Sequence, residues 1–195
     1  MLDRQPVLTG ERLVLRPLQE ADWEALFAVA ADPLVWQIHP AHDRWQEPVF
    51  REFFAEALAA GGALVVIERA SGAISGSSQF REHPAPETHG AESAIEIGWT
   101  FLARRLWGGG YNAEMKRLML AHALQAVERV EFRVGESNVI SRRAMANIGG
   151  VLTEREDITV RAGVPHRHVI YEIDRAGFAA GPLGENCRRQ DFLPA

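Results

Sequence analysis

Three consecutive glycines, Gly108 to Gly110, separate two segments of different periodicity. Before them, SAIEIGWTFL is a long apolar stretch that predicts a strand, and after them YNAEMKRLMLAHALQAVER has the polar stripe of an amphipathic helix. A second strand, VEFRV, follows directly. The middle of the chain therefore predicts a strand–helix–strand crossover whose helix begins at a glycine loop.

The segments on either side complete a mixed sheet. RLVLRPL alternates like a half-buried strand, helical segments follow over residues 20–32 and around 50–59, and ALVVIERASGAISGSSQF predicts two strands joined by a Ser-Gly turn. After VEFRV we expect a short helix over 138–149 and a hairpin that turns near Ala162 and Gly163. This order predicts an α/β (α+β) fold on one sheet that is mainly antiparallel.

Length and composition predict the domain organisation and the class of protein. The 195 residues, 47% of them hydrophobic, suit a single domain over 1–175, followed by a loosely held tail over 176–195. The net charge of −5 is spread along the chain, which excludes a typical nucleic-acid-binding surface. A single cysteine, Cys187, permits no internal disulfide, and no apolar run is long enough to span a bilayer. We therefore expect a cytoplasmic protein without membrane partners.

The glycine run has two interpretations. The first amides of a helix lack intrahelical partners and lie at its electropositive end, so a loop without side chains lets a pyrophosphate approach them. The alternative is a flexible turn, which is the better explanation for an isolated triplet. The preceding strand, the following amphipathic helix, and Arg104 and Arg105 on the approach favour the anion site.

A dinucleotide-binding loop is a weaker alternative. Gly108, Gly110 and Ala113 match the pattern GxGxxA, and Glu131 lies at a suitable distance downstream. In that fold, however, the glycines follow their strand directly, whereas ARRLW intervenes here. Too little chain remains afterwards for further parallel units, so this match does not support a nucleotide-dependent oxidoreductase.

Four motifs in order resemble the GNAT superfamily of N-acyltransferases. Arg105, Gly108 and Gly110 form RxxGxG, which resembles the acyl-CoA pyrophosphate loop of that family. TGERLVLRPLQEADW, IEIGWTF and NVISRRAMANIGG resemble its first strand and helix, its fourth strand and its NxxS helix. The resemblance extends from about Thr9 to Tyr171, and it is nearest to the RimJ/RimL-like branch.

This resemblance implies a fold and a cosubstrate. The sheet would be mixed, mostly antiparallel and seven-stranded, flanked by about four helices, with its central strands splayed apart. Acetyl-CoA would bind with its pantetheine arm along the fourth strand, its pyrophosphate in the glycine loop, and its thioester near the NxxS helix. The implied binding residues are Thr100, Phe101, Leu102, Arg105, Gly108, Gly109, Gly110, Tyr111, Asn112, Asn138 and Ser141.

The implied reaction is direct attack of a primary amine on the acetyl carbonyl, which requires a base for the amine. Glu96 is the candidate, acting through a water molecule, because the alternation that buries Ile95 and Ile97 directs it to the opposite face. The alternative is a solvated or ion-paired strand carboxylate without a catalytic role.

The departing thiolate also needs a proton. Many family members carry a tyrosine seven residues after the asparagine, but this chain has Met145 there, and methionine cannot donate. The resemblance then makes Ser141 the expected donor. Its alternative role is structural, in the first turn of a helix that Asn138 caps.

The acceptor implied by the RimJ/RimL resemblance is the N-terminal α-amine of a protein or peptide. Two alternatives stay open: a small amine such as a polyamine or aminoglycoside, and a non-catalytic acyl-CoA-binding regulatory module. A homodimer is plausible by analogy alone.

Other polar residues carry weaker predictions. His39 and His42, with Trp36 and Trp45, lie in the segment expected over the acceptor site, where packing and surface roles are the simpler explanation. The remaining candidates are Lys116, expected to reach the phosphates or be solvated, and His166 and His168, which lack a third metal ligand. We therefore expect no metal.

Overall fold

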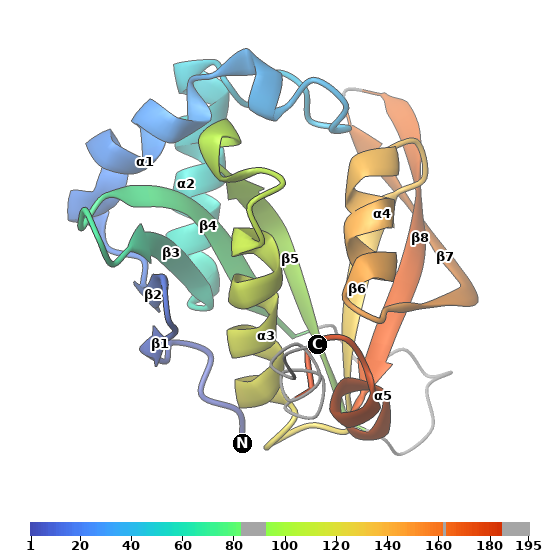
Figure 1. Cartoon of the computed structure of the whole chain (residues 1–195). Helices are drawn as coiled ribbons and strands as arrows, with labels where there is room; N and C mark the ends of the chain where they lie inside the picture. Colours follow the sequence, from blue (N-terminus) through green and yellow to red (C-terminus); the bar gives the residue numbers. More distant parts are fainter. Residues whose placement is uncertain (83–92, 162, 185–195) are drawn as a thin grey trace.

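The structure is a computed structural model that describes residues 1–82, 93–161 and 163–184. Within these residues the chain forms one sheet of eight strands in the order β1-β2-β3-β4-β5-β6-β8-β7, with helices on both faces (Figure 1). The strands are β1 (Leu8–Thr9), β2 (Leu13–Pro17), β3 (Ala63–Glu68), β4 (Ile74–Arg81), β5 (Ala94–Leu102), β6 (Arg129–Gly135), β7 (Val151–Arg161) and β8 (Val164–Asp174). The α-helices are α1 (Trp23–Ala30), α2 (Glu47–Ala60), α3 (Tyr111–Ala123), α4 (Val139–Asn147) and α5 (Arg175–Ala180).

The mixed sheet flanked by helices is confirmed, but the predicted numbers of strands and helices are each one too low for the described residues. The additional strand, β1, is two residues long and pairs with β2, and so short a segment has no periodicity to read. The additional helix, α5, lies almost entirely within the segment predicted as a tail, and Asp174 caps it by accepting a hydrogen bond from Gly177 N at 2.6 Å. Residues 185–195, with Cys187, and Ala162 in the predicted hairpin turn lie outside the described residues.

The central strands splay apart, as predicted. β5 and β6 are parallel, with α3 as the crossover between them, and they pair only at Ala94↔Arg129, Ile95↔Val130 and Glu96↔Glu131. Beyond these three pairs the two strands diverge, which Figure 1 shows plainly. Backbone groups on the facing edges of β5 and β6 therefore lose their strand partners along the rest of the gap.

A bulge in β5 sets which side chains face which helices. Two residues of β5, Trp99 and Thr100, lie opposite Ser78 of β4, and Trp99 adopts a left-handed φ of 51°. An extra residue of this kind shifts the alternation of the side chains that follow it. As a result Thr100 faces α3, whereas Glu96 lies on the other face of the sheet.

Two apolar clusters cover the two faces. One contains buried side chains of α3 and α4, such as Met115, Met119 and Met145, packed on the inner strands. The other contains Leu26 of α1 and Phe50 of α2. The sheet thus separates the α3 and α4 helices on one face from the α1 and α2 helices on the other. The splay of β5 and β6 leaves an opening between the two faces.

Glu114 ties the first turn of α3 to β2. Its side chain is buried, and it accepts hydrogen bonds from the N–H groups of Arg12 at 2.8 Å and Leu13 at 3.2 Å and from Arg12 Nε at 2.9 Å. Burial on its own would raise the pKa of Glu114, but the hydrogen bonds from Arg12 and Leu13 outweigh it and lower that pKa below its usual range.

Replacing Glu114 with glutamine is expected to lower the free energy of unfolding by about 1–3 kcal/mol, because Arg12 loses its carboxylate partner. A carboxyl group with a lowered folded pKa stabilises the protein above its unfolded pKa and ceases to do so as the pH falls through the folded value. Urea unfolding below about pH 4.5 should therefore show a steeper loss of stability for the natural protein than for the variant. Glu47→Gln, at an exposed ion pair with Arg51, is the control and should cost less than about 0.5 kcal/mol.

Candidate active site

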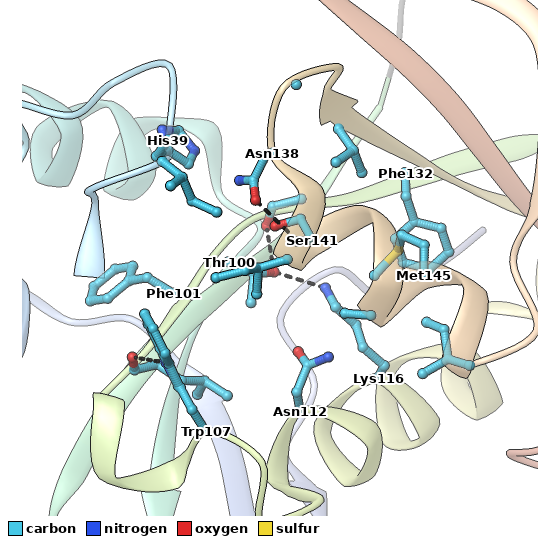
Figure 2. Close-up of a pocket in the computed structure, with 18 of the residues that line it drawn as sticks. His39, Thr100, Phe101, Trp107, Asn112, Lys116, Phe132, Asn138, Ser141 and Met145 are labelled. Atoms are coloured by element: carbon cyan, nitrogen blue, oxygen red, sulfur yellow. Dashed lines mark hydrogen bonds between the residues drawn. The ribbon is translucent and has the colours of Figure 1, made fainter. Parts of the chain in front are cut away.

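A cavity of about 510 Å³ occupies the gap between β5 and β6. Segments far apart in the sequence meet around it, and Figure 2 shows Thr100 of β5 between the side chains of α3 and α4. Its walls include Thr100, Phe101 and Leu102 of β5, Gly108, Gly110, Asn112 and Lys116 of the glycine loop and α3, Arg133 of β6, Asn138, Ser141 and Met145 near and on α4, His168 of β8, and Trp36 and His39.

Residues 31–46, here named the arch, cross the wide end of the gap. In Figure 1 this blue segment runs from α1 toward the β7–β8 hairpin. Asp43 of the arch forms an ion pair with Arg161 of β7, and Pro40 packs on Gly135, where an added Cβ would lie 2.9 Å from Pro40 Cγ. The arch therefore connects the two sides of the splay and walls the cavity on the α1–α2 side.

The backbone of the glycine loop is shaped so that a ligand can approach it closely. Gly108 and Gly110 have φ values of 73° and 77°, a left-handed conformation that costs other residues roughly 1–2 kcal/mol. Apart from the adjacent residues of the loop, no atom of the described residues lies within 4 Å of the position that a Cβ on Gly108 would take. Gly110 is the N-cap of α3, so the loop brings the unpartnered amides of a helix start beside open space in the cavity wall.

Three of the predicted binding residues do not line the cavity. The guanidinium of Arg105 instead contacts Glu68 and donates to Ser75 Oγ at 3.0 Å. Gly109 and Tyr111 are held by Arg12, which donates to Gly109 O at 2.7 Å and lies 4.3 Å from the centre of the Tyr111 ring. These contacts hold the glycine loop and the residues just before it in place from outside the cavity. The predicted residues that do line the cavity are Thr100, Phe101, Leu102, Gly108, Gly110, Asn112, Asn138 and Ser141.

Asn138 and Ser141 have both of the roles considered for them from the sequence. Asn138 caps α4, accepting a hydrogen bond from Ser141 N at 3.0 Å, and both residues line the cavity. Met145, one turn further along α4, is 5% exposed and lines the same wall. This wall therefore offers a hydroxyl and an amide, but methionine in place of an acidic group.

Glu96 lies just behind the wall of the cavity. It is 3% exposed, and its Oε2 is 3.3 Å from Nε of Arg133, which does line the cavity. Its Oε1 is 3.1 Å from the position that a Cβ on Gly98 would take, and Gly98 is part of the wall. The carboxylate is thus ion-paired, and it also adjoins a part of the wall that has no side chain.

His39 faces the cavity as a neutral imidazole. Burial, and then the positive charges of Arg44 and Arg161, lower the pKa of His39 to about 3. Its Nδ1 accepts a hydrogen bond from Ala41 N at 2.9 Å, which places the remaining proton on Nε2. Its ring packs edge-on against the buried indole of Trp36, 5.6 Å between centroids. His39 can therefore donate a hydrogen bond into the cavity, but it is not poised to act as a base.

Replacing His39 with glutamine is expected to flatten the pH dependence of stability just below neutrality. A histidine with a lowered folded pKa binds its proton in the unfolded state first, so the natural protein should lose stability as the pH falls below 6.5. The slope from this one group is at most about 1.4 kcal/mol per pH unit, and the partial exposure of the ring reduces it. Urea unfolding between pH 7 and 5 measures it, and parallel curves for the two proteins would contradict the assignment.

Of the two predictions for Lys116, the solvated position is wrong. Its side chain is 2% exposed, and Nζ donates to Thr100 Oγ1 at 2.8 Å (Figure 2). A signal was present, because Lys116 shares the spacing of Leu120 and Ala123 on the buried stripe of α3.

Residues 1–82, 93–161 and 163–184 contain no group of three or more His, Cys, Asp or Glu side chains placed to hold a metal ion. None of the helices in the described ranges has the length and apolar character needed to cross a bilayer.

Comparisons with known proteins agree with this architecture. Residues 12–151 match the family model described as an acetyltransferase (GNAT) domain. Among solved structures, a GNAT-family acetyltransferase from Bacillus anthracis is 21% identical, with 87% of this chain and 98% of that chain covered and a TM-score of 0.70. A GCN5-related N-acetyltransferase from Brucella melitensis is 20% identical, with 95% and 85% covered and a TM-score of 0.75. RimJ from Mycobacterium smegmatis, in complex with CoA-disulfide, is 18% identical, with 94% of each chain covered and a TM-score of 0.67.

Proposed function

The chain belongs to the GNAT acetyltransferases, and from this premise we propose that it acetylates the N-terminal α-amine of a protein or peptide, as a RimJ/RimL-like enzyme. The observation that carries the proposal is the cavity in the splay of β5 and β6, which has the glycine loop on one face of the sheet and the arch on the other. Such an opening lets an acyl donor and an amine enter from opposite faces and meet inside the sheet.

The α3–α4 side fits acetyl-CoA, which supplies an activated acetyl thioester when bound. On its β6 side, β5 has no strand partner beyond Glu96 among the described residues, so the backbone groups of this edge are available to the amides of a pantetheine arm, as in strand addition. The positive φ of Gly108 and Gly110 and the open space beside the loop suit a pyrophosphate at the start of α3. We assign Thr100 to Leu102, the glycine loop, Asn112, Asn138 and Ser141 to this role.

The α1–α2 side suits the acceptor. We propose that Glu96 receives the amine proton through a water molecule beside Gly98, since its carboxylate adjoins the wall there. Ser141 places a hydroxyl on the α4 wall, where it can hydrogen-bond the thioester group.

The donors on this side favour an α-amine over a polyamine. His39, whose Nε2 carries the proton, and Arg133, which is cationic, both line the cavity and are hydrogen-bond donors. In a peptide N-terminus a carbonyl oxygen lies next to the amine and can accept from such donors, whereas a polyamine has no acceptor and adds positive charge beside Arg133.

Thiol release from acetyl-CoA tests the proposal. We expect turnover with short peptides that have a free α-amine, little with the same peptides blocked at the N-terminus, and little with spermidine or an aminoglycoside. Mass spectrometry of the product should place the acetyl group on the α-nitrogen. Binding of CoA without turnover of any amine would instead favour the regulatory module, and preference for a small amine would favour the alternative acceptor.

A further inference from the structure

Lys116 is chemically exceptional in this chain. The sequence contains 21 lysine and arginine residues, and Lys116 is the only lysine among them. Arginine stays protonated in proteins, whereas a buried lysine can lose and regain its proton near neutral pH. Apart from the histidines, Lys116 is therefore the one cationic side chain that can readily lose its proton, and it lies in the wall of the cavity.

In the part of the chain that the structure describes, Lys116 is surrounded by hydroxyl groups and an aromatic ring and has no ion-pair partner. Nζ donates to Thr100 Oγ1 at 2.8 Å and to Ser78 Oγ at 3.4 Å, both at the bulge of β5 and β4, and lies 5.4 Å from the centre of the Phe132 ring. Lys116 forms no salt bridge with the described residues, and the carboxylate that acts on it electrostatically, Glu96, is paired with Arg133. An ammonium group with three protons has two hydroxyl acceptors here, so one N–H has no hydrogen-bond acceptor in the described structure.

Burial lowers the pKa of Lys116 to about 7, against a smaller opposing effect of the negative charge of Glu96. Glu96 is the charged group on the surrounding strands that acts on it, while β4 contributes Ser78 and β6 contributes Phe132. Arg133 of β6 is paired with Glu96 and Asp157. Near neutral pH both forms of the lysine are therefore populated, which is the condition for efficient proton transfer.

We infer that Lys116 is the proton donor to the thiolate of coenzyme A, an assignment that rests on the acetyl transfer proposed above. The amine nitrogen bonds to the acetyl carbon, and the carbon–sulfur bond breaks with its electron pair on sulfur. A proton then passes from Lys116 Nζ to that sulfur, which leaves as the thiol, while the amine proton leaves through Glu96 to water. Water in the emptied cavity reprotonates the lysine.

The other groups at the cavity wall are less suited to this step. Met145 has no acidic proton, and the Ser141 hydroxyl is too weak an acid to do more than relay one. Arg133 is held in ion pairs with Glu96 and Asp157, and His39, which is neutral, lies in the arch on the opposite face from the glycine loop. His168 lies on β8, opposite Gly135, the last residue of β6. Lys116 lies on α3, the helix that begins at the glycine loop assigned to the pyrophosphate, and it is on the same face of the sheet as that loop.

The single lysine allows a direct test that does not depend on activity. In protein labelled with carbon-13 lysine, the one side-chain signal reports the ionisation of Lys116. We expect a midpoint near pH 7 in the free protein, whereas a midpoint near the ordinary lysine value of about 10.4 would overturn the inference. This titration can fail while acetyl transfer is intact, and the thiol-release assay can fail while the titration is as expected, so the two proposals are tested separately.

Two variants then test the step itself. Lys116→Met and Lys116→Arg are both expected to lower kcat by about 10²–10⁴-fold, because neither side chain can deliver a proton at neutral pH. In the natural protein the rate should fall as the pH rises through the lysine midpoint, and this descending limb should be absent from both variants. CoA affinity by calorimetry should change less than about threefold, which separates this role from a structural one. Recovery of the rate in Lys116→Arg, persistence of the limb, or self-acetylation of Lys116 would overturn the inference.

Discussion

Glu96→Gln is expected to lower kcat/KM with the best peptide acceptor by about 10²-fold or more, with CoA binding unchanged. Glutamine keeps the shape of the side chain and can still contact Arg133, but it cannot accept a proton from an attacking amine. The loss should appear in thiol release at saturating acetyl-CoA. It follows from the position of the carboxylate, 3.1 Å from the Cβ site of Gly98 in the cavity wall.

Glu131→Gln is a matched control for this change. Glu131 is the register partner of Glu96 on β6 and is buried in the same way. It forms ion pairs with Arg129 at 3.2 Å and Arg155 at 2.9 Å, and neither of these arginines lines the cavity, unlike Arg133, the partner of Glu96. We expect this variant to lose roughly 1–3 kcal/mol of stability while kcat/KM stays within about threefold. Equal losses of activity in the two variants would show that the effect at Glu96 comes from disturbing a buried ion pair and not from removing a base.

Gly108→Ala is expected to weaken CoA binding by about tenfold or more, measured by calorimetry. Its Cβ would enter the open space where we place the pyrophosphate, and the left-handed φ of 73° adds strain of roughly 1–2 kcal/mol. Gly61 provides the control, because it has a φ of 62°, also has nothing within 4 Å of its Cβ site, and ends α2 away from the cavity. Gly61→Ala should cost similar stability and leave CoA affinity intact. Equal affinities for the two variants would remove the glycine loop from the proposed binding site.

The parts of the fold that sequence reasoning predicted are those with strong local signals. The apolar alternation of β5, the polar stripe of α3 and the glycine loop between them each fix one element and its type. The crossover and the mixed sheet then follow from the order of elements. The splay of β5 and β6, by contrast, was expected only through family resemblance, because no local pattern encodes where a pairing stops.

Other features depended on tertiary contacts. The bulge at Trp99 shows its effect only when β4 is aligned with β5, and the arch is held by an ion pair between Asp43 and Arg161, far apart in sequence. Arg105 belongs to a recognisable motif, yet its guanidinium is engaged by Glu68. The burial of Lys116 was readable from helical spacing, but the charge of the side chain favoured a solvated position.

The short ladder of paired residues between β5 and β6 affects the stability of the protein. Only three residue pairs join the two halves of the sheet there, so the protein forgoes the remaining hydrogen bonds of a full parallel ladder. Without a ligand, those amides must be hydrated, and they add little to the stability of the free protein. In the binding mode proposed above, the acyl donor would bring its own amide groups into this gap. It would then supply part of the stability of the folded protein, and this contribution would rise with its concentration.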